Sequence, residues 1–319
     1  MIKSGIAGSI RGHYKLEKYN ANTNELKQVL EFDNKILNAG LNGLHTHSAG
    51  GYQPDALGFA VGTGTSVPLA TNVGLDNLIA SGGNRVGSVL LNPTAPDYVS
   101  ARRYVTRFNA GVINNTITEI GSFLMYGNNK YEYLSRSLIL DNNGNPTSVT
   151  VADNEYLDVT YDLYFYPKTF ETTGTFELEG ITYEYLNRTI EIQSVSLHNS
   201  SNGYSFADNQ WFLRTYSDNT PSNFDDKVTG SYISNFSYEG DYIPNTFKRK
   251  VSFTLDLNQG NFDGGLGSII IRSAYMVRYL SKITFNPKLP KDNTCRMKFV
   301  FESPQLAEYV PPPTPSTGD

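Results

Sequence analysis

The sequence predicts a mainly β fold, made of antiparallel sheets or β-sandwich domains with one or two short helices. The chain contains 22 Tyr and 17 Phe, and Asn, Thr, Ser and Gly are abundant; these residue types favour strands and turns. The clearest pattern lies in residues 157–166, where apolar and polar residues alternate. The apolar set is Leu157, Val159, Tyr161, Leu163 and Phe165. Such a period of two indicates a strand with one buried face, which Pro167 would end.

The length of 319 residues favours two domains, since a domain averages ~150 residues. We expect a β-rich N-terminal domain over residues 1–168 and a β-sandwich-like C-terminal domain over residues 169–310. A proline-rich tail follows at 311–319. This tail contains too little apolar surface to form a core of its own.

The N-terminal domain begins with eleven residues that we interpret as a surface tail or as an arm lying on a neighbouring subunit. Residues 14–19 and 25–32 then predict a β-hairpin, because Asn and Thr side chains can hydrogen-bond to the turn between them. Residues 35–44 carry apolar side chains at helical spacing, with Asp33 or Asn34 as the N-cap. Gly40 and Gly43 favour close packing of this helix against a sheet.

Further elements follow in the same domain. Residues 59–65 predict a strand that enters a glycine-rich turn, and residues 75–80 predict a helical turn. Residues 116–125 and 133–140 predict strands that join the strand at 157–166 in meander order, because Asn, Asp, Gly and Pro between them favour tight reversals.

The C-terminal domain carries similar signals. Residues 182–197 predict a strand with one β-bulge, and residues 251–257 predict an amphipathic strand. Residues 269–279 and 296–301 would complete a sandwich. Cys295 is the only cysteine, which excludes a disulfide within the chain, and we interpret it as a buried, inert thiol in a strand.

Composition argues against several classes of partner. The net charge is −5, and the 26 basic and 31 acidic residues are mixed along the chain. No basic stripe is present to bind a phosphate backbone, so we expect no nucleic-acid partner. No run of ~18 apolar residues occurs, and the N-terminus lacks an apolar segment. We therefore expect that the chain is synthesised in the cytoplasm and does not insert into a membrane.

The sequence contains no pattern typical of a catalytic site, so we expect no catalytic residue and no cofactor. A G-x-S-x-G motif is absent, and no histidine stands beside a recognisable nucleophile. His45 and His47 form a His-Thr-His sequence that could share a metal ion in an extended segment. We favour solvated loop histidines, because no further ligand lies close in sequence. For the loops at 141–146 and 261–265 we favour turn chemistry over calcium binding, because neither has EF-hand spacing.

Two stretches carry a resemblance to a known family. The first comprises Phe32, Asp33, Asn34, residues 36–41 and 61–65, Pro68, Thr71 and Leu75. The second comprises Phe108, Ala110, Gly111, Ile113, Ile117, Glu119, Ile120, Gly121, Leu134, Ser135, Arg136, Asp141, Gly144, Pro146 and residues 155–161. Together they resemble virion proteins of tailed bacteriophages, of the tail-fibre or minor tail protein type. The resemblance covers roughly the first half of the chain and ends near Lys168.

The resemblance implies a structural component of a phage tail, such as a tail fibre, tail tip or baseplate protein, that mediates assembly and host attachment. It implies other tail proteins as partners, a homo-oligomer, with a trimer favoured, and location in the virion after synthesis in the host cytoplasm.

An alternative function is glycan handling, as a receptor-binding module or a polysaccharide depolymerase. Residues 199–241 combine aromatic side chains with Asn, Asp and Ser, a composition suited to sugars. The aromatic candidates are Tyr204, Phe206, Trp211, Phe212 and Tyr216. Aromatic side chains of this kind are also ordinary interface anchors, which is the interpretation that we favour. No repeat of 20–50 residues supports a depolymerase solenoid.

Overall fold

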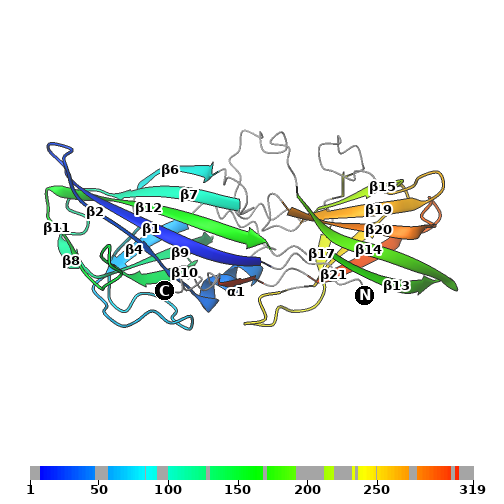
Figure 1. The fold of residues 1–319 in the computed structure, drawn as a ribbon, viewed down its shortest axis with the longest axis horizontal. Coiled ribbons are helices and arrows are strands. Elements are labelled where there is room, and N and C mark those ends of the chain that lie inside the picture. The colour runs from blue at the N-terminus through cyan, green and yellow to red at the C-terminus, as the bar shows by residue number, and fades with distance from the viewer. Residues whose placement is uncertain are drawn as a thin grey trace, which may run out of the picture.

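The computed structural model describes residues 8–46, 57–82, 84–91, 100–126, 130–167, 171–191, 212–218, 232–233, 236–248, 250–272, 279–302 and 306–308. These residues form two β-sandwiches that follow one another along the long axis of the molecule (Figure 1). The strands are mostly antiparallel, and one short helix lies in the first sandwich. The predicted mainly β fold is therefore confirmed.

In the first sandwich two sheets lie face to face, and five strands follow one another across each of them. One sheet has the order β2-β1-β12-β7-β6 and contains β1 (Gly8–Asn20), β2 (Leu26–Asp33), β6 (Asn84–Leu91), β7 (Ser100–Phe108) and β12 (Glu155–Pro167). The other has the order β3-β10-β9-β4-β5 and contains β3 (Lys35–Ile36), β4 (Leu57–Gly62), β5 (Leu78–Gly82), β9 (Glu119–Tyr126) and β10 (Lys130–Leu138). A two-stranded sheet of β8 (Asn115–Ile117) and β11 (Val149–Val151) lies beside them.

The core of this sandwich lies between the two sheets and is rich in aromatic rings. The five alternating apolar residues of β12 are all buried, as the sequence predicts. The rings of Tyr14 and Tyr161 lie 4.6 Å apart, and Phe59 of the facing sheet packs edge-on against both. The Tyr14 hydroxyl shares a hydrogen bond of 2.9 Å with Ser135 Oγ, so the buried phenol is satisfied.

The second sandwich has its own core. Its larger sheet has the order β13-β14-β20-β19-β15-β16 and contains β13 (Glu171–Leu178), β14 (Ile181–Glu191), β15 (Phe212–Tyr216), β16 (Tyr232–Ile233), β19 (Leu266–Arg272) and β20 (Tyr279–Leu289). The smaller sheet has the order β17-β18-β21 and contains β17 (Phe236–Tyr238), β18 (Lys250–Leu255) and β21 (Met297–Glu302). The first core ends at Phe165 and the second begins at Tyr183. These two residues bracket the expected boundary at 168, and the domain limits themselves stay a prediction.

A short strand connects the two sandwiches near the end of the chain. Strand β22 (Leu306–Glu308) pairs in parallel with Gly8–Ile10 of β1. The Glu308 carboxylate accepts hydrogen bonds from Ile36 N at 3.0 Å and from Lys35 Nζ at 2.5 Å. Residues of the expected second domain thus complete a sheet of the first.

The helix differs in part from the expectation. Helix α1 (Asn38–Thr46) begins three residues later than predicted, because Lys35 and Ile36 pair with β10 as strand β3. Neither Asp33 nor Asn34 caps it: Asp33 binds Arg11 and His13, and Asn34 binds Gly12 N and the Tyr161 hydroxyl.

The close helix packing is confirmed. A Cβ atom at Gly40 would lie 2.4 Å from Leu134 Cα, and one at Gly43 would lie 2.1 Å from Glu132 Oε2.

Four other expectations are wrong. Residues 78–82 form strand β5 where a helical turn was expected. Strands β9 and β10 pair as a hairpin, but β12 lies in the opposite sheet, so the meander is not formed. Residues 8–11 belong to β1, so this part of the first eleven residues is no surface arm, while residues 1–7 lie outside the described residues. Cys295 lies in the turn before β21 and is partly exposed, because the strand begins only at Met297.

Candidate functional site

The residues singled out in the sequence are only partly described. His45 lies in the last turn of α1, while His47, Tyr204, Phe206 and Trp211 fall outside the described residues. Phe212 begins strand β15 and Tyr216 ends it. Tyr216 is 7% exposed, and burial raises the pKa of its hydroxyl to about 12. The Tyr216 side chain is therefore largely excluded from solvent, although it does not belong to the core cluster between the two sheets.

Asp141 shows turn chemistry. Its Oδ1 accepts hydrogen bonds from Asn143 N and Asn145 N, and these bonds lower the pKa of the carboxyl group. Within the described ranges, no group of three or more His, Cys, Asp or Glu side chains is placed to hold a metal ion.

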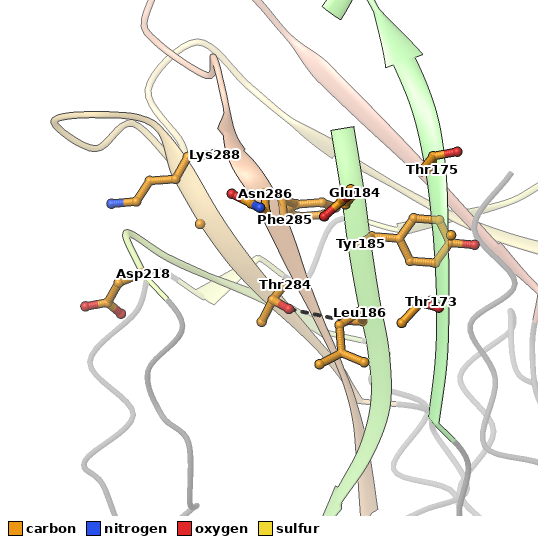
Figure 2. A pocket seen from close by; sticks show the side chains of 12 residues that line it. Thr173, Thr175, Glu184, Tyr185, Leu186, Asp218, Thr284, Phe285, Asn286 and Lys288 are labelled. Carbon is orange, nitrogen blue, oxygen red and sulfur yellow. Dashed lines mark hydrogen bonds between the residues drawn. The ribbon is translucent and has the colours of Figure 1, made fainter. Parts of the chain in front are cut away.

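A groove lies on the outer face of the six-stranded sheet of the second sandwich (Figure 2). Two rows of residues line it. Each row runs across β13, β14 and β20 and contains one residue from each strand, paired with its neighbours in the sheet. The rows are Thr175–Glu184–Asn286 and Thr173–Leu186–Thr284. The groove has a volume of about 640 Å³, which is within the usual range of ligand sites.

The rim of the groove is formed by Asp218 and Lys288 (Figure 2). Asp218 approaches this closely because Gly267 has no side chain: a Cβ atom there would lie 2.7 Å from Asp218 Cα. The groove thus offers carboxylate, amide, hydroxyl and ammonium groups around the apolar side chain of Leu186. Such a set can exchange hydrogen bonds with a polyhydroxylated ligand.

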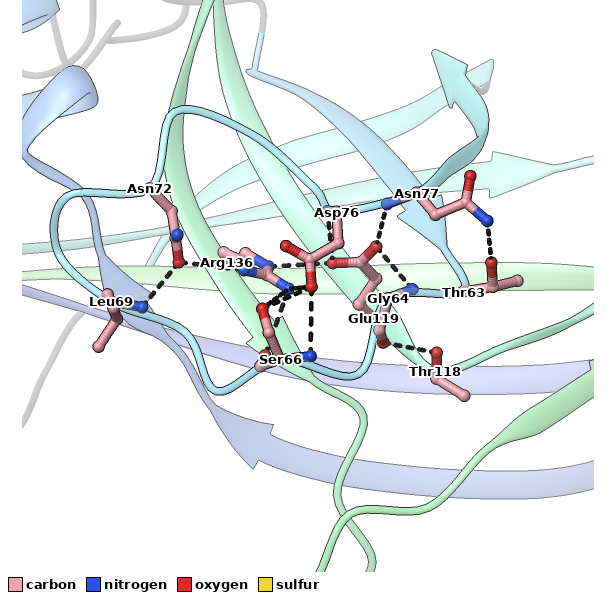
Figure 3. A network of polar contacts seen from close by, with 10 residues as sticks. All are labelled: Thr63, Gly64, Ser66, Leu69, Asn72, Asp76, Asn77, Thr118, Glu119 and Arg136. Carbon is pink, nitrogen blue, oxygen red and sulfur yellow. Dashed lines mark hydrogen bonds and ion pairs between the residues drawn. The ribbon is translucent and has the colours of Figure 1, made fainter.

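A second feature is a polar network in the first sandwich, beneath residues 63–77, which we call the 63–77 loop (Figure 3). The loop joins β4 to β5. The Glu119 side chain is fully buried, and its Oε1 accepts hydrogen bonds from Gly64 N at 2.8 Å and Asn77 N at 2.9 Å. Its Oε2 accepts from Asp76 N at 3.1 Å and from Arg136 Nε at 3.0 Å.

Arg136 completes the network. Its side chain is fully buried and donates to Asn72 Oδ1 at 3.0 Å and to Ser66 Oγ at 3.1 Å. It also lies 2.6 Å from Asp76 Oδ2. Hydrogen bonds from Ser66, followed by Arg136, lower the pKa of the Asp76 carboxyl group. Both ends and the middle of the loop are therefore attached to one buried ion pair.

The outer side of the 63–77 loop carries three exposed aliphatic side chains. Val67 is 73% exposed, Leu69 is 57% exposed and Val73 is 81% exposed. Scattered exposed aliphatic residues are common on proteins. Here three exposed aliphatic side chains belong to one loop, and the buried ion pair holds that loop in a defined conformation. We call the surface formed by Val67, Leu69 and Val73 the 63–77 ridge.

The sequence reasoning did not assign a role to Glu119 and Arg136, although both belong to the stretch that carries the resemblance. The available signal was a single charged residue in each of the two expected strands, Glu119 in residues 116–125 and Arg136 in residues 133–140, with opposite signs. Charged residues are almost never fully buried unless they are paired. Their spacing in sequence cannot show that they face each other, because the register of the two strands decides it.

The outer face of the larger sheet of the first sandwich carries paired charges. Arg103 binds Asp162 and Arg107 binds Asp158 through two hydrogen bonds of 2.7 Å each. His13 Nδ1 lies 2.9 Å from Asp33 Oδ1. The hollow of about 490 Å³ on this face is lined largely by such mutually compensating groups.

Comparisons with known proteins add no relative: no protein family, curated protein or solved structure matches the chain. None of the helical residues that the structure describes forms a helix long and apolar enough to cross a membrane.

Proposed function

We propose that this chain is a structural subunit of a bacteriophage tail, in a tail fibre, tail tip or baseplate, that docks to another tail protein through the 63–77 ridge. Two lines support the proposal. The first half of the sequence resembles tail proteins, and the ridge belongs to that half. The charged pair that fixes the ridge, Glu119 and Arg136, is also part of the resemblance.

The observation that carries the proposal is the pre-organised shape of the ridge. A flexible loop loses conformational freedom when it docks, whereas a loop already held by hydrogen bonds does not. Full burial of an aliphatic side chain contributes ~1.5–3 kcal/mol. Val67, Leu69 and Val73 together can therefore anchor a stable contact without an ordering penalty.

The test uses phage particles whose own copy of the gene is deleted and supplied in trans. We expect gold-labelled antibodies against the chain to mark the tails of particles. A variant with Val67→Ser, Leu69→Ser and Val73→Ser should fold normally but fail to enter particles. Val112→Ser is the control, because Val112 is 49% exposed in the same sandwich but lies outside the ridge.

Label away from the tail would overturn the proposal, and so would normal incorporation of the triple variant. Equal thermal unfolding temperatures of the variants and the parent protein would show that an assembly defect does not arise from misfolding.

A second candidate function is glycan binding in the groove of the second sandwich. Glu184 is exposed and faces Asn286 across the sheet, so both can bind neighbouring hydroxyl groups of a saccharide. We expect Glu184→Ala to lose binding to bacterial surface polysaccharides, while Asp263→Ala, an exposed carboxylate outside the groove, should retain it. Equal binding by both variants would exclude this groove, and release of new reducing ends would indicate a depolymerase.

A further inference from the structure

Strand β13 forms one edge of the six-stranded sheet. Its eight residues, Glu171–Leu178, pair with β14 and with no other strand in the part of the chain that the structure describes. Glu171, Thr172, Thr173, Thr175 and Glu177 are exposed. The strand contains no proline or lysine, the residues that commonly protect an edge against pairing with another strand.

The turn after β13 shows which backbone groups point outward. Glu179 and Gly180 have φ angles of 52° and 78° and join Leu178 to Ile181, which pair directly. In a hairpin closed by two such residues, the flanking pair is hydrogen-bonded, and bonded pairs then alternate along the ladder. The backbone groups of Gly174 and Phe176 therefore point to β14. Those of Thr173, Thr175 and Glu177 point to the open edge.

We propose that the open edge of β13 pairs with β13 of a second copy of this chain, antiparallel, with the twofold axis at Thr175. Thr175 then faces the partner's Thr175, and Thr173 faces the partner's Glu177. Gly174, which has no side chain, faces the partner's Phe176. The three outward-pointing residues of each strand exchange about six backbone hydrogen bonds, because a bonded antiparallel pair exchanges two.

Charge selects this register over its neighbour. With the axis at Gly174, Glu171 would face the partner's Glu177 on both sides of the axis, and like charges opposite each other destabilise a sheet. With the axis at Thr175, each Glu177 faces a threonine within the paired strands, and Glu171 comes level only with Glu179 of the partner subunit, which lies in the turn beyond the end of β13. Both registers keep the outer faces of the two sheets on the same side, because opposed residues differ by an even number of positions.

This inference rests on the proposed structural role and deepens it by naming one partner, a second copy. The contact is twofold, so it predicts an even number of subunits, whereas the resemblance implied three. It also joins two six-stranded sheets into one continuous sheet and leaves the 63–77 ridge available for another protein.

The test is a crosslinking experiment on the full chain in which Cys295 is first replaced by serine. In that background, Thr175→Cys places two thiols directly opposite each other, and we expect a short thiol-to-thiol crosslinker to produce a covalent dimer. Thr173→Cys is the matched control: it is exposed on the same strand, but its two copies would lie about 13 Å apart along the strands, at ~3.3 Å per residue. It should give no covalent dimer.

A proline variant provides an independent readout. Thr175→Pro removes an N–H group that points to the open edge, so the hydrogen bonds to β14 remain intact. We expect light scattering to show a shift from dimer to monomer, with the unfolding temperature of the monomer maintained.

Equal crosslinking at positions 173 and 175 would overturn the register. An oligomer that does not crosslink at 175, or a parent protein that is monomeric at micromolar concentration, would overturn the pairing itself. Incorporation into particles tests the proposed function separately, since it depends on the ridge.

Discussion

The Nε atom of Arg136 lies 3.0 Å from Oε2 of Glu119, and neither side chain has exposed surface. Two charges withdrawn from water in this way are stable only when hydrogen bonds satisfy them. Here the donors and acceptors come from the backbone and side chains of the 63–77 loop. The ion pair and the loop therefore depend on each other.

The first prediction concerns this pair. Glu119→Ala leaves the Arg136 charge buried beside only Asp76 and removes the acceptor of three loop amides, so we expect a loss of about 3–5 kcal/mol in the free energy of unfolding. Chemical denaturation measures this loss. Arg296→Ala, which breaks an exposed ion pair with Asp256, serves as the control and should change stability little. Similar effects of both substitutions would contradict the role of the buried pair.

The second prediction concerns Gly40. An added methyl group would meet the backbone of β10 at Leu134, which has little freedom to move. We expect Gly40→Ala to destabilise the protein by roughly 1–3 kcal/mol, in spite of the better helix propensity of alanine. Gly87→Ala is the matched control, because nothing lies within 4 Å of its Cβ position. A stabilising effect at Gly40 would mean that α1 can move away from the sheet.

The third prediction concerns pH. The hydrogen bond to Asp33 raises the pKa of His13 above its ordinary value of 6.5. A raised folded-state pKa adds stability that is fully present below 6.5 and is lost as the pH rises through the folded-state value. His13→Gln should therefore reduce the unfolding free energy more at about pH 5.5, where His13 is charged, than at about pH 9, where it is neutral.

The partner carboxyl group sets the lower limit of this window. The pKa of Asp33 is lowered from 3.8 by its bonds to His13 and Arg11, although burial acts against them. Its contribution is present above 3.8 and is lost as the pH falls through the folded-state value. Denaturation curves at several pH values measure both limits. A difference between parent and variant that does not depend on pH would contradict the charged pair.

The fourth prediction concerns the connection through Glu308. Glu308→Ala removes the acceptor of Ile36 N and the partner of Lys35. We expect faster amide hydrogen exchange in Gly8–Ile10 of β1, where β22 pairs, because local opening becomes easier. Glu25→Ala breaks a pair with Lys27 at the exposed hairpin turn and should leave that exchange unchanged. Unaltered exchange in the Glu308 variant would show that strand pairing alone holds β22.

Local patterns predicted the elements whose cause is local. The alternation in residues 157–166 identified β12, the Asn-rich turn identified the β1–β2 hairpin, and Gly40 and Gly43 identified a close contact. In each case the evidence lies within a few residues: Asn20 Oδ1, for example, accepts hydrogen bonds from the N–H groups of Asn22 and Thr23.

The elements that were missed depend on distant residues. Ile36 continues the helical spacing of Leu37 and Leu41, yet it joins β10 as a strand, because Ser135 offers a pairing partner. Strand β12 follows β10 along the chain but pairs with β1 and β7 instead. The groove is likewise assembled from β13, β14, β20 and Asp218, and no local pattern indicates that these segments meet.

Strand β22 also bears on how the protein is made. On the side of β1 opposite β12, β2 pairs with His13–Tyr19 and β22 with Gly8–Ile10. Glu308 is synthesised 273 positions after Lys35, the residue that it binds. While the ribosome is still translating the second half, the start of β1 lacks the strand that, among the described residues, pairs with it on that side. The first sandwich can close this gap only after the sequence of the second has emerged.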